Sequence, residues 1–335
     1  MRALFVGLGS IGQRHLINFK HLVGNKAEIF AYRQTNHNLI IREGKAKTCR
    51  SLAQYYGFQT CPSLSEAFNV YPDVVFITNP SAYHLAPAIK AASHGCHLFI
   101  EKPLSHSLKG VTSLQNIIHR KKLVVMVGYQ TRFHPCYQFL EKMISRKRYG
   151  RLLSADFEWG TYLPAHHPYE DYRKGYAALN KLGGGVLLGL SHELDMICNL
   201  WGQPDELFAV GGQLSPLSMD TEDTVSVLMK YRRHSQSFPV SLFLSYAQTK
   251  ETRRFKVQMA RATILGDFME NTVQVFDQKG NVIIFESFIE FDRNELFISE
   301  MKEFVKAVKI KRKPLVDIDD GIESLKLALR IKKKL

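Results

Sequence analysis

The hydrophobic positions of the chain follow one pattern up to residue 128 and another beyond it. In the first part, short apolar runs alternate with segments whose apolar residues recur at helical spacing. Strand-like runs are Ala3–Gly7, Glu28–Tyr32, Asp73–Thr78, His97–Ile100 and Leu123–Val127, and helix-like segments are Ile11–Val23, Tyr83–His94 and Ser105–Lys122. Because strands that alternate with helices form parallel sheets covered on both faces, this part predicts a doubly covered parallel sheet.

The second part contains longer β-prone stretches with partial alternation and few helices between them. These stretches are Leu152–Tyr162, Thr224–Tyr231, Phe238–Ala247 and Phe255–Leu265. They predict a large, mostly antiparallel sheet. Helices are predicted for a segment containing Val186–Trp201 and for Glu295–Ile310 and Asp320–Lys334.

The length and composition are those of a globular protein of two domains. The chain has 335 residues, of which 45% are hydrophobic and 23% charged. No apolar run reaches the ~18 residues that a membrane-spanning helix needs. The five cysteines are scattered without a CxxC pair, so neither a disulfide framework nor a metal site is expected. A cytoplasmic protein is the expectation.

The net charge of +14 lies mostly in the first part of the chain. Residues 1–130 hold 15 Lys and Arg against 5 Asp and Glu, a net of +10. Such a surface attracts nucleic acid, anionic membrane or anionic small molecules, or is simply solvated. The basic clusters at 146–148, 311–313 and 332–334 are short and typical of solvated faces, so neither a nucleic-acid nor a membrane partner is expected.

A glycine-rich loop follows the first predicted strand and opens the first predicted helix. Gly7-Leu8-Gly9-Ser10-Ile11-Gly12 matches GxGxxG in the context that indicates a dinucleotide site. Gly7 permits a tight turn, Gly9 lets the backbone approach a pyrophosphate, and Gly12 allows close packing of helix and strand. The alternative is an ordinary glycine turn in another α/β protein.

The end of the second predicted strand bears on the choice of cofactor. An acidic residue there would bind the ribose hydroxyls of NAD, but the sequence has Tyr32-Arg33-Gln34-Thr35. Arg33 can pair with a 2′-phosphate, and Thr35 can add a hydroxyl donor. NADP is therefore favoured, with NAD and a merely solvated arginine as alternatives.

Polar residues also follow two later strands, where ligands of such sheets bind. Thr78-Asn79-Pro80 with His84 follows one strand, and Glu101-Lys102-Pro103 follows the next. A partly desolvated lysine can relay protons, whereas the alternative is a surface lysine before a turn.

These residues belong to a longer series of motifs. Further along stand Gly128-Tyr129-Gln130-Thr131-Arg132-Phe133-His134-Pro135, Gly183-Gly184-Gly185 and Ser191-His192-Glu193-Leu194-Asp195. In content and order, the series resembles the glucose–fructose oxidoreductase / inositol 2-dehydrogenase / MocA (Gfo/Idh/MocA) family over nearly the whole chain.

The resemblance implies a Rossmann domain over 1–128 and a substrate-binding and oligomerisation α+β domain over 129–335, whose final helices can return to the first domain. It implies NAD(P)-dependent oxidation or reduction of a sugar, polyol or related compound, and a homodimer or homotetramer. Lys102 matches a lysine that contacts substrate and relays protons, and His192 matches the general acid/base. Gln130 is expected at the cofactor, and Arg132 at the nicotinamide or substrate.

One departure from the family pattern concerns the mechanism. Family members commonly carry an aspartate shortly before the histidine, but this chain has Gly189 there. Glu193, Asp195 or a tyrosine substitutes, the substrate is unusual, or catalysis is weakened. A catalytically weak protein that senses NADP or a sugar is therefore the alternative to an enzyme.

The segment Trp159–Tyr176 is dense in aromatic, histidine and charged residues. It resembles a segment of a subgroup found among surface-polysaccharide sugar enzymes. Tyrosines stack on sugar faces, and an arginine binds carboxylate or phosphate. Tyr162, Arg173 and Tyr176 are the expected substrate residues, against the alternative of an ordered loop without a ligand.

Overall fold

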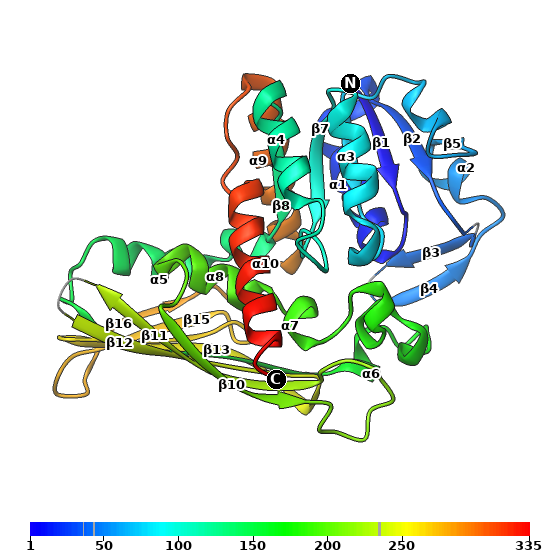
Figure 1. The fold of residues 1–335 in the computed structure, drawn as a ribbon. Helices are drawn as coiled ribbons and strands as arrows, with labels where there is room; N and C mark the ends of the chain where they lie inside the picture. The colour runs from blue at the N-terminus through cyan, green and yellow to red at the C-terminus, as the bar shows by residue number, and fades with distance from the viewer. Residues whose placement is uncertain (36, 43, 234–235) are drawn as a thin grey trace.

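A computed structural model describes residues 1–35, 37–42, 44–233 and 236–335 of the protein. The predicted mixed α/β architecture is confirmed, with one parallel and one mainly antiparallel sheet in the same chain (Figure 1).

The first sheet is parallel throughout. Its order is β5 (Gln59–Cys61), β2 (Glu28–Tyr32), β1 (Arg2–Val6), β6 (Val74–Ile77), β7 (His97–Glu101) and β8 (Val125–Gly128). The strand order reverses between β1 and β6, so a crevice forms beyond their carboxyl ends. Gly7, Thr78 and Asn79 lie at that reversal, directly after these two strands.

Helices cover both faces of this sheet, as its continuous apolar strands require. One face packs on α1 (Ser10–Val23), α2 (Leu52–Tyr56) and α9 (Arg293–Ile310). The other packs on α3 (Leu85–Ser93), α4 (Val111–Lys121) and α10 (Ile318–Lys332). The last two helices thus return to the first sheet, where the Val127 N–H also donates to the Val316 carbonyl at 3.1 Å. Figure 1 shows α10 beside α4 and β8, and the Gln115 side chain of α4 donates to Asp319 Oδ1 of α10 at 2.6 Å.

The second sheet is antiparallel except for one parallel pair, β12–β9. Its order is β10 (Glu206–Gly212), β11 (Thr224–Arg233), β12 (Gln236–Ser245), β9 (Leu152–Tyr162), β13 (Ala247–Met259), β14 (Ala262–Asp267), β15 (Thr272–Phe276) and β16 (Val282–Ser287). Its inner face packs on α5 (Pro135–Ser145) and α8 (His192–Trp201). In the part of the chain that the structure describes, no helix lies on the outer face (Figure 1).

Several elements differ from the sequence prediction. The helix expected across 186–201 is broken into α7 (Val186–Gly189) and α8, because glycine is a poor helix former and Leu190 leaves the helical region. The stretch 255–265 is two strands joined by a turn at Ala260. The hairpin of β3 (Leu39–Arg42) and β4 (Lys45–Thr48), the short helix α6 (Leu163–His166) and strands β10, β15 and β16 had no distinct signal.

In the described ranges, no helix combines the length and apolarity that a membrane span requires.

Candidate functional site

The glycine-rich loop forms a cradle between β1 and α1. Gly7 has φ +94°, and its N–H donates to the Tyr32 carbonyl at 3.0 Å. A Cβ on Gly12 would lie 2.7 Å from both the Gly7 carbonyl oxygen and Thr78 Oγ1, so no other residue fits there. The Thr78 hydroxyl also closes the loop by donating to the Gly7 carbonyl at 2.7 Å.

The open side of this cradle suits a pyrophosphate. A Cβ on Gly9 would meet no atom within 4 Å, and Gly9 caps α1 without a side-chain hydrogen bond. The first turn of α1, which contains Ser10 and Ile11, holds no acidic residue. The helix N-terminus therefore presents unpaired N–H groups and positive potential to an anion.

Arg33 lies one residue beyond the end of β2, next to the cradle. Its guanidinium lies 5.8 Å from the Phe58 ring centroid and donates to the His37 carbonyl at 3.1 Å. Burial lowers the pKa of Arg33 from its usual value. Thr35 is exposed two residues further on. An adenosine ribose seated at this strand end would therefore meet a cation.

The polar residues after β6 and β7 are tied to each other. His84 is buried, with Nε2 2.7 Å from the Asn79 carbonyl and Nδ1 3.0 Å from the Pro103 carbonyl. Burial lowers the pKa of His84, so the ring is neutral and donates to one of the two carbonyls. His84 thus joins the two loops.

Two amide oxygens in this region lack a partner within the described residues. They are Asn79 Oδ1 and Gln130 Oε1, and both are buried. Gln130 opens the 3₁₀ turn that follows β8. A buried acceptor without a donor is costly unless a ligand supplies one, so these atoms fit a dinucleotide that carries ribose hydroxyls and an amide group.

Lys102 reaches from the first sheet to the second half of the chain. Its Nζ donates to the Gly189 carbonyl at 2.7 Å, and its N–H donates to Glu101 Oε2 at 3.1 Å. The peptide bond between Lys102 and Pro103 is cis. Glu101 is buried and contacts His15 Nε2 at 2.5 Å. The ammonium is thereby bound at Gly189, which precedes His192 by three positions in the chain.

His192 is the first residue of α8 and is 2% exposed. Tyr129 meets the imidazole edge-on at 5.6 Å between ring centroids, and Trp159 lies at 6.1 Å. Burial, with the charges of Lys102, Arg253 and Arg293, lowers the pKa of His192 well below its usual value. Its Nδ1 has no partner among the described residues. The side chain is therefore neutral at physiological pH and able to accept a proton.

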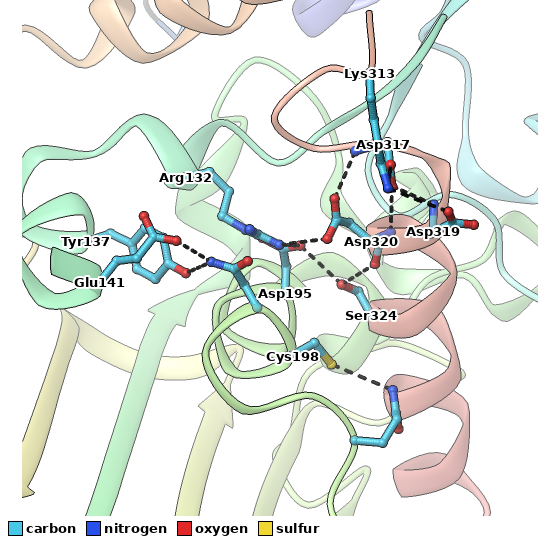
Figure 2. Close-up of polar contacts among 12 residues, drawn as sticks. Arg132, Tyr137, Glu141, Asp195, Cys198, Lys313, Asp317, Asp319, Asp320 and Ser324 are labelled. Atoms are coloured by element: carbon cyan, nitrogen blue, oxygen red, sulfur yellow. Dashed lines mark hydrogen bonds and ion pairs between the residues drawn. The ribbon is translucent and has the colours of Figure 1, made fainter. Parts of the chain in front are cut away.

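Arg132, which is expected at the nicotinamide or the substrate, is held in a buried ion pair. It is 4% exposed and makes a two-point pair with Asp195, at 2.6 Å from Nε and 3.0 Å from Nη2. Figure 2 shows this pair with Asp320 and Ser324 of α10 beside it. Burial opposes the charge, but the Asp195 carboxylate raises the pKa of Arg132. The arrangement places Arg132 in an ion pair that joins the 3₁₀ turn η4 (Gln130–Phe133), α8 and α10.

The segment 159–176 is only partly directed at this region. Arg173 is exposed and pairs with Asp171 in its own turn, Tyr162 is 38% exposed, and Tyr176 is half-buried. His166 is closer to the site. Burial, together with the charges of His167, Lys102 and Arg293, lowers the pKa of His166 to about 4. In the sequence, nothing distinguishes His166 from the other histidines and aromatic residues of this segment.

Arg253 and Trp159 were also missed by the sequence prediction. Arg253 stacks 4.0 Å from the Trp159 ring centroid, donates to Glu193 at 2.6 Å and donates to the Thr131 hydroxyl at 3.0 Å. Arg253 lies on β13 among alternating charged residues, a pattern that looks solvated from the sequence alone.

Two profiles of one protein family match the chain. Residues 1–129 match the oxidoreductase family with an NAD-binding Rossmann fold, and residues 137–265 match the GFO/IDH/MocA C-terminal domain. The chain belongs to the GFO/IDH/MocA oxidoreductase family. Several members similar to it are named for the sugars or polyols on which they act.

Among similar members, a myo-inositol 2-dehydrogenase of Thermotoga maritima is 27% identical over all of this chain and 96% of its own length. A levoglucosan dehydrogenase of Pseudarthrobacter phenanthrenivorans is 28% identical over 51% of this chain and 44% of its own length.

Solved structures of the GFO/IDH/MocA family share the fold at low identity. A levoglucosan dehydrogenase in complex with NADH has a TM-score of 0.83 at 18% identity, covering 100% of this chain and 96% of that one. A UDP-N-acetylglucosamine 3-dehydrogenase of Acidithiobacillus ferrooxidans has a TM-score of 0.77 at 20% identity, covering 100% and 97%.

Proposed function

We propose that the protein is an NADP-preferring dehydrogenase or reductase that acts on a CH–OH group of a sugar, a polyol or a sugar derivative. The observation that carries the proposal is the Lys102–Gly189 hydrogen bond of 2.7 Å, which brings an ammonium from the dinucleotide domain close to a buried, neutral His192. The Gly7–Gly12 cradle, Asn79 and Gln130 would hold the cofactor, and Arg33 favours its phosphorylated form.

The proposed roles of the two residues follow from their charge. A bound nicotinamide supplies the hydride acceptor or donor. In the oxidising direction, the His192 imidazole accepts the proton of the substrate hydroxyl, since its lowered pKa keeps it neutral beforehand. Lys102 Nζ stabilises the negative charge that develops on that oxygen. In the reducing direction, the same groups return the proton.

The proposed substrate is a sugar derivative of the kind used in surface polysaccharides, bound against the segment 159–176. Tyr162, Tyr176 and the neighbouring Trp159 offer aromatic faces and hydroxyls, while Arg173 offers a charge at the rim. Lys102, Arg253 and Arg293 all lower the pKa of His192, so the surroundings of the ring carry positive charge. A substrate with a carboxylate or phosphate suits such surroundings.

Turnover by the purified chain tests this proposal. It is assayed with NADP⁺, NAD⁺ and their reduced forms against neutral sugars, inositols, uronic acids and nucleotide sugars. We expect Lys102→Ala to lower turnover at least about a hundredfold while leaving the Kd for NADPH nearly unchanged. Lys121→Ala, which alters an exposed lysine on α4, is the control and should retain turnover.

Two results would contradict the proposal. Full turnover by Lys102→Ala would remove the assigned role of the lysine. Tight NADPH binding without turnover of any compound would favour the alternative of a sensing protein, which the absence of a side chain at Gly189 makes worth testing.

The division into domains at 128/129 is part of the same proposal, as is self-association through the outer face of the second sheet. Phe208, Val210, Leu228 and Phe285 are exposed on that face, and apolar patches of this kind mark interfaces. Light scattering should give the mass of a dimer or tetramer, and a monomer would contradict self-association.

The five unpaired cysteines agree with the proposed cytoplasmic location, where thiols stay reduced.

A further inference from the structure

Gly189 is required by space and not by backbone conformation. It ends α7 without a positive φ, and its carbonyl accepts the hydrogen bond from Lys102 Nζ. A Cβ built on Gly189 would overlap the hydroxyl oxygen of Tyr246 and would lie 2.9 Å from its Cζ. The phenol therefore fills the volume that a side chain at position 189 would need.

Tyr246 is fixed in that position from several sides. It lies between β12 and β13, its N–H donates to the Asp223 carbonyl at 2.8 Å, and its carbonyl accepts from the Leu163 N–H at 2.9 Å. His166 packs edge-on against the ring at 5.7 Å between centroids. The residue is 1% exposed, and burial raises the pKa of its hydroxyl well above the usual value. The hydroxyl therefore stays protonated.

The acidic residues near Lys102 on α8 have other partners. Glu193 Oε1 is paired with Arg253 at 2.6 Å, while its Oε2 has no hydrogen-bond partner among the described residues, and Asp195 is paired with Arg132 at 2.6 Å. Of the substitutes for a carboxylate that the sequence suggests, the tyrosine is the one that contacts position 189.

We propose that Tyr246 is a positioning residue for Lys102, because it fixes the Gly189 carbonyl that holds the ammonium. Lys102 is then oriented by a backbone oxygen, and a neutral hydroxyl stands beside that backbone in place of an acidic side chain at position 189. The ammonium is left with its full charge for the substrate oxygen. The inference rests on the proposed place of Lys102 at the reacting centre.

Size exchange between positions 189 and 246 tests the inference. Gly189→Ala drives a methyl group into the Tyr246 hydroxyl, whereas Tyr246→Phe removes that hydroxyl and leaves a gap. In the double variant, the methyl group takes the place of the hydroxyl, and the ring must move outward because its Cζ would otherwise lie 2.9 Å from the new Cβ. If Tyr246 acts through the Gly189 backbone, each single variant releases Lys102 and the double variant restores it.

The first measurement needs no substrate. Acetylation of Lys102 by an N-hydroxysuccinimide ester is followed by mass spectrometry, with Lys121, which donates to the Ser93 carbonyl, as the internal control. Loss of a hydrogen bond from a charged group corresponds to about tenfold, so we expect each single variant to be acetylated about tenfold faster at Lys102. The double variant should return towards the wild-type rate, and Lys121 should not change.

The second measurement is kcat on the best sugar, at unchanged Kd for NADPH. We expect kcat to fall in both single variants and to recover in the double variant. The inference would be overturned if Lys102 were acetylated at the same rate in all four proteins. It would also be overturned if the effects of the two single variants on that rate were additive in the double variant. If Gly189→Ala does not fold, Tyr246→Phe decides alone, since an unchanged rate would overturn it. Because acetylation is independent of turnover, failure of the proposed function would not conceal the outcome.

Discussion

The carboxyl group of Glu300 lies inside the protein without a hydrogen-bond partner among the described residues. It is on α9 and fully buried, and both of its oxygens lack a donor. Burial, with the nearby Glu101 carboxylate, raises the pKa of Glu300 well above 4.5. Glu101 in turn supports Lys102 and contacts His15, so the acid lies directly behind the proposed catalytic segment.

This pKa predicts a pH-dependent stability. The folded chain keeps a proton that the unfolded chain releases above pH 4.5, so the free energy of unfolding contributed by Glu300 falls as the pH rises towards its folded pKa. The fall amounts to about 1.4 kcal/mol per pH unit in that window. Glu300→Gln should therefore raise Tm more at pH 8 than at pH 5. An equal change at both pH values would contradict the assignment.

Arg33 is the residue on which the proposed cofactor preference depends. A charge-assisted hydrogen bond to the 2′-phosphate contributes about 1.5–3 kcal/mol, which corresponds to at least about tenfold in Kd. We expect fluorescence titration to show tighter binding of NADPH than of NADH, and Arg33→Ala to abolish the difference. Arg120→Ala removes the same charge from exposed α4 and should preserve it. Equal Kd values in the wild type would contradict this preference.

The residues that the sequence makes predictable are those whose chemistry is local. The Gly7–Gly12 loop is recognisable because a turn and a close approach each require glycine at fixed spacing. Tyr246 and Arg253 were not predictable, because their roles depend on contacts with residues about 60 positions away. The ion pair of Arg132 with Asp195 was not predictable either, since the two residues lie 63 positions apart in the sequence.

At the scale of elements, the Arg132–Asp195 pair links three segments of the chain. It joins the turn after β8 to α8, and α10 adds Ser324 at 3.2 Å from Asp195 Oδ1 (Figure 2). Because His192 opens α8, the pair fixes the start of that helix relative to the first sheet. The helix α10 is itself anchored by a capping box between Asp317 and Asp320.

Removing one partner of this pair should be strongly destabilising. Asp195→Ala leaves the Arg132 guanidinium buried and unpaired, which costs about 3–5 kcal/mol. Urea unfolding should show this loss, whereas Glu206→Gln, which breaks an exposed pair with Arg232, should change the free energy of unfolding by less than about 1 kcal/mol. Similar losses in the two variants would contradict a structural role specific to the buried pair.

The elements themselves were predictable to different degrees. Five parallel strands of the first sheet are continuous apolar runs, so their positions were evident, whereas the edge strand β5 is short and polar and was not predicted. Edge strands such as β16 are exposed and lack that signal. The break between α7 and α8 falls just after Gly189, a glycine that the packing of Tyr246 requires and that the neighbouring residues in the sequence do not explain.

At the scale of the whole molecule, the C-terminal end of the chain packs on the N-terminal sheet. Phe304 of α9 packs edge-on against Phe76 and Phe99, with centroids 5.6 Å from each, so the core of the first sheet is completed by a helix from the end of the sequence. The excess positive charge of residues 1–130 lies on this domain, in agreement with an anionic dinucleotide.

Helix α9 should therefore contribute strongly to the stability of the domain that contains the first sheet. Phe304→Ala is expected to lower the free energy of unfolding by about 3–5 kcal/mol and to weaken NADPH binding as the domain loosens. Leu315→Ala, at a half-exposed site nearby in sequence, should change the free energy of unfolding by less than about 0.5 kcal/mol. Calorimetry measures both, and a Phe304→Ala protein as stable as the wild type would contradict the packing.

The return of α9 and α10 to the first sheet also dictates how this protein can be recombined with its relatives. A single crossover after Gly128 would join the parallel sheet to foreign final helices, and Phe76, Phe99 and Val127 would meet unmatched surfaces. A hybrid that keeps its own cofactor domain needs a second crossover before Arg293, so that only the segment 129–292 is exchanged. The part of the chain that must be kept together for cofactor binding therefore consists of two separate segments, 1–128 and 293–335.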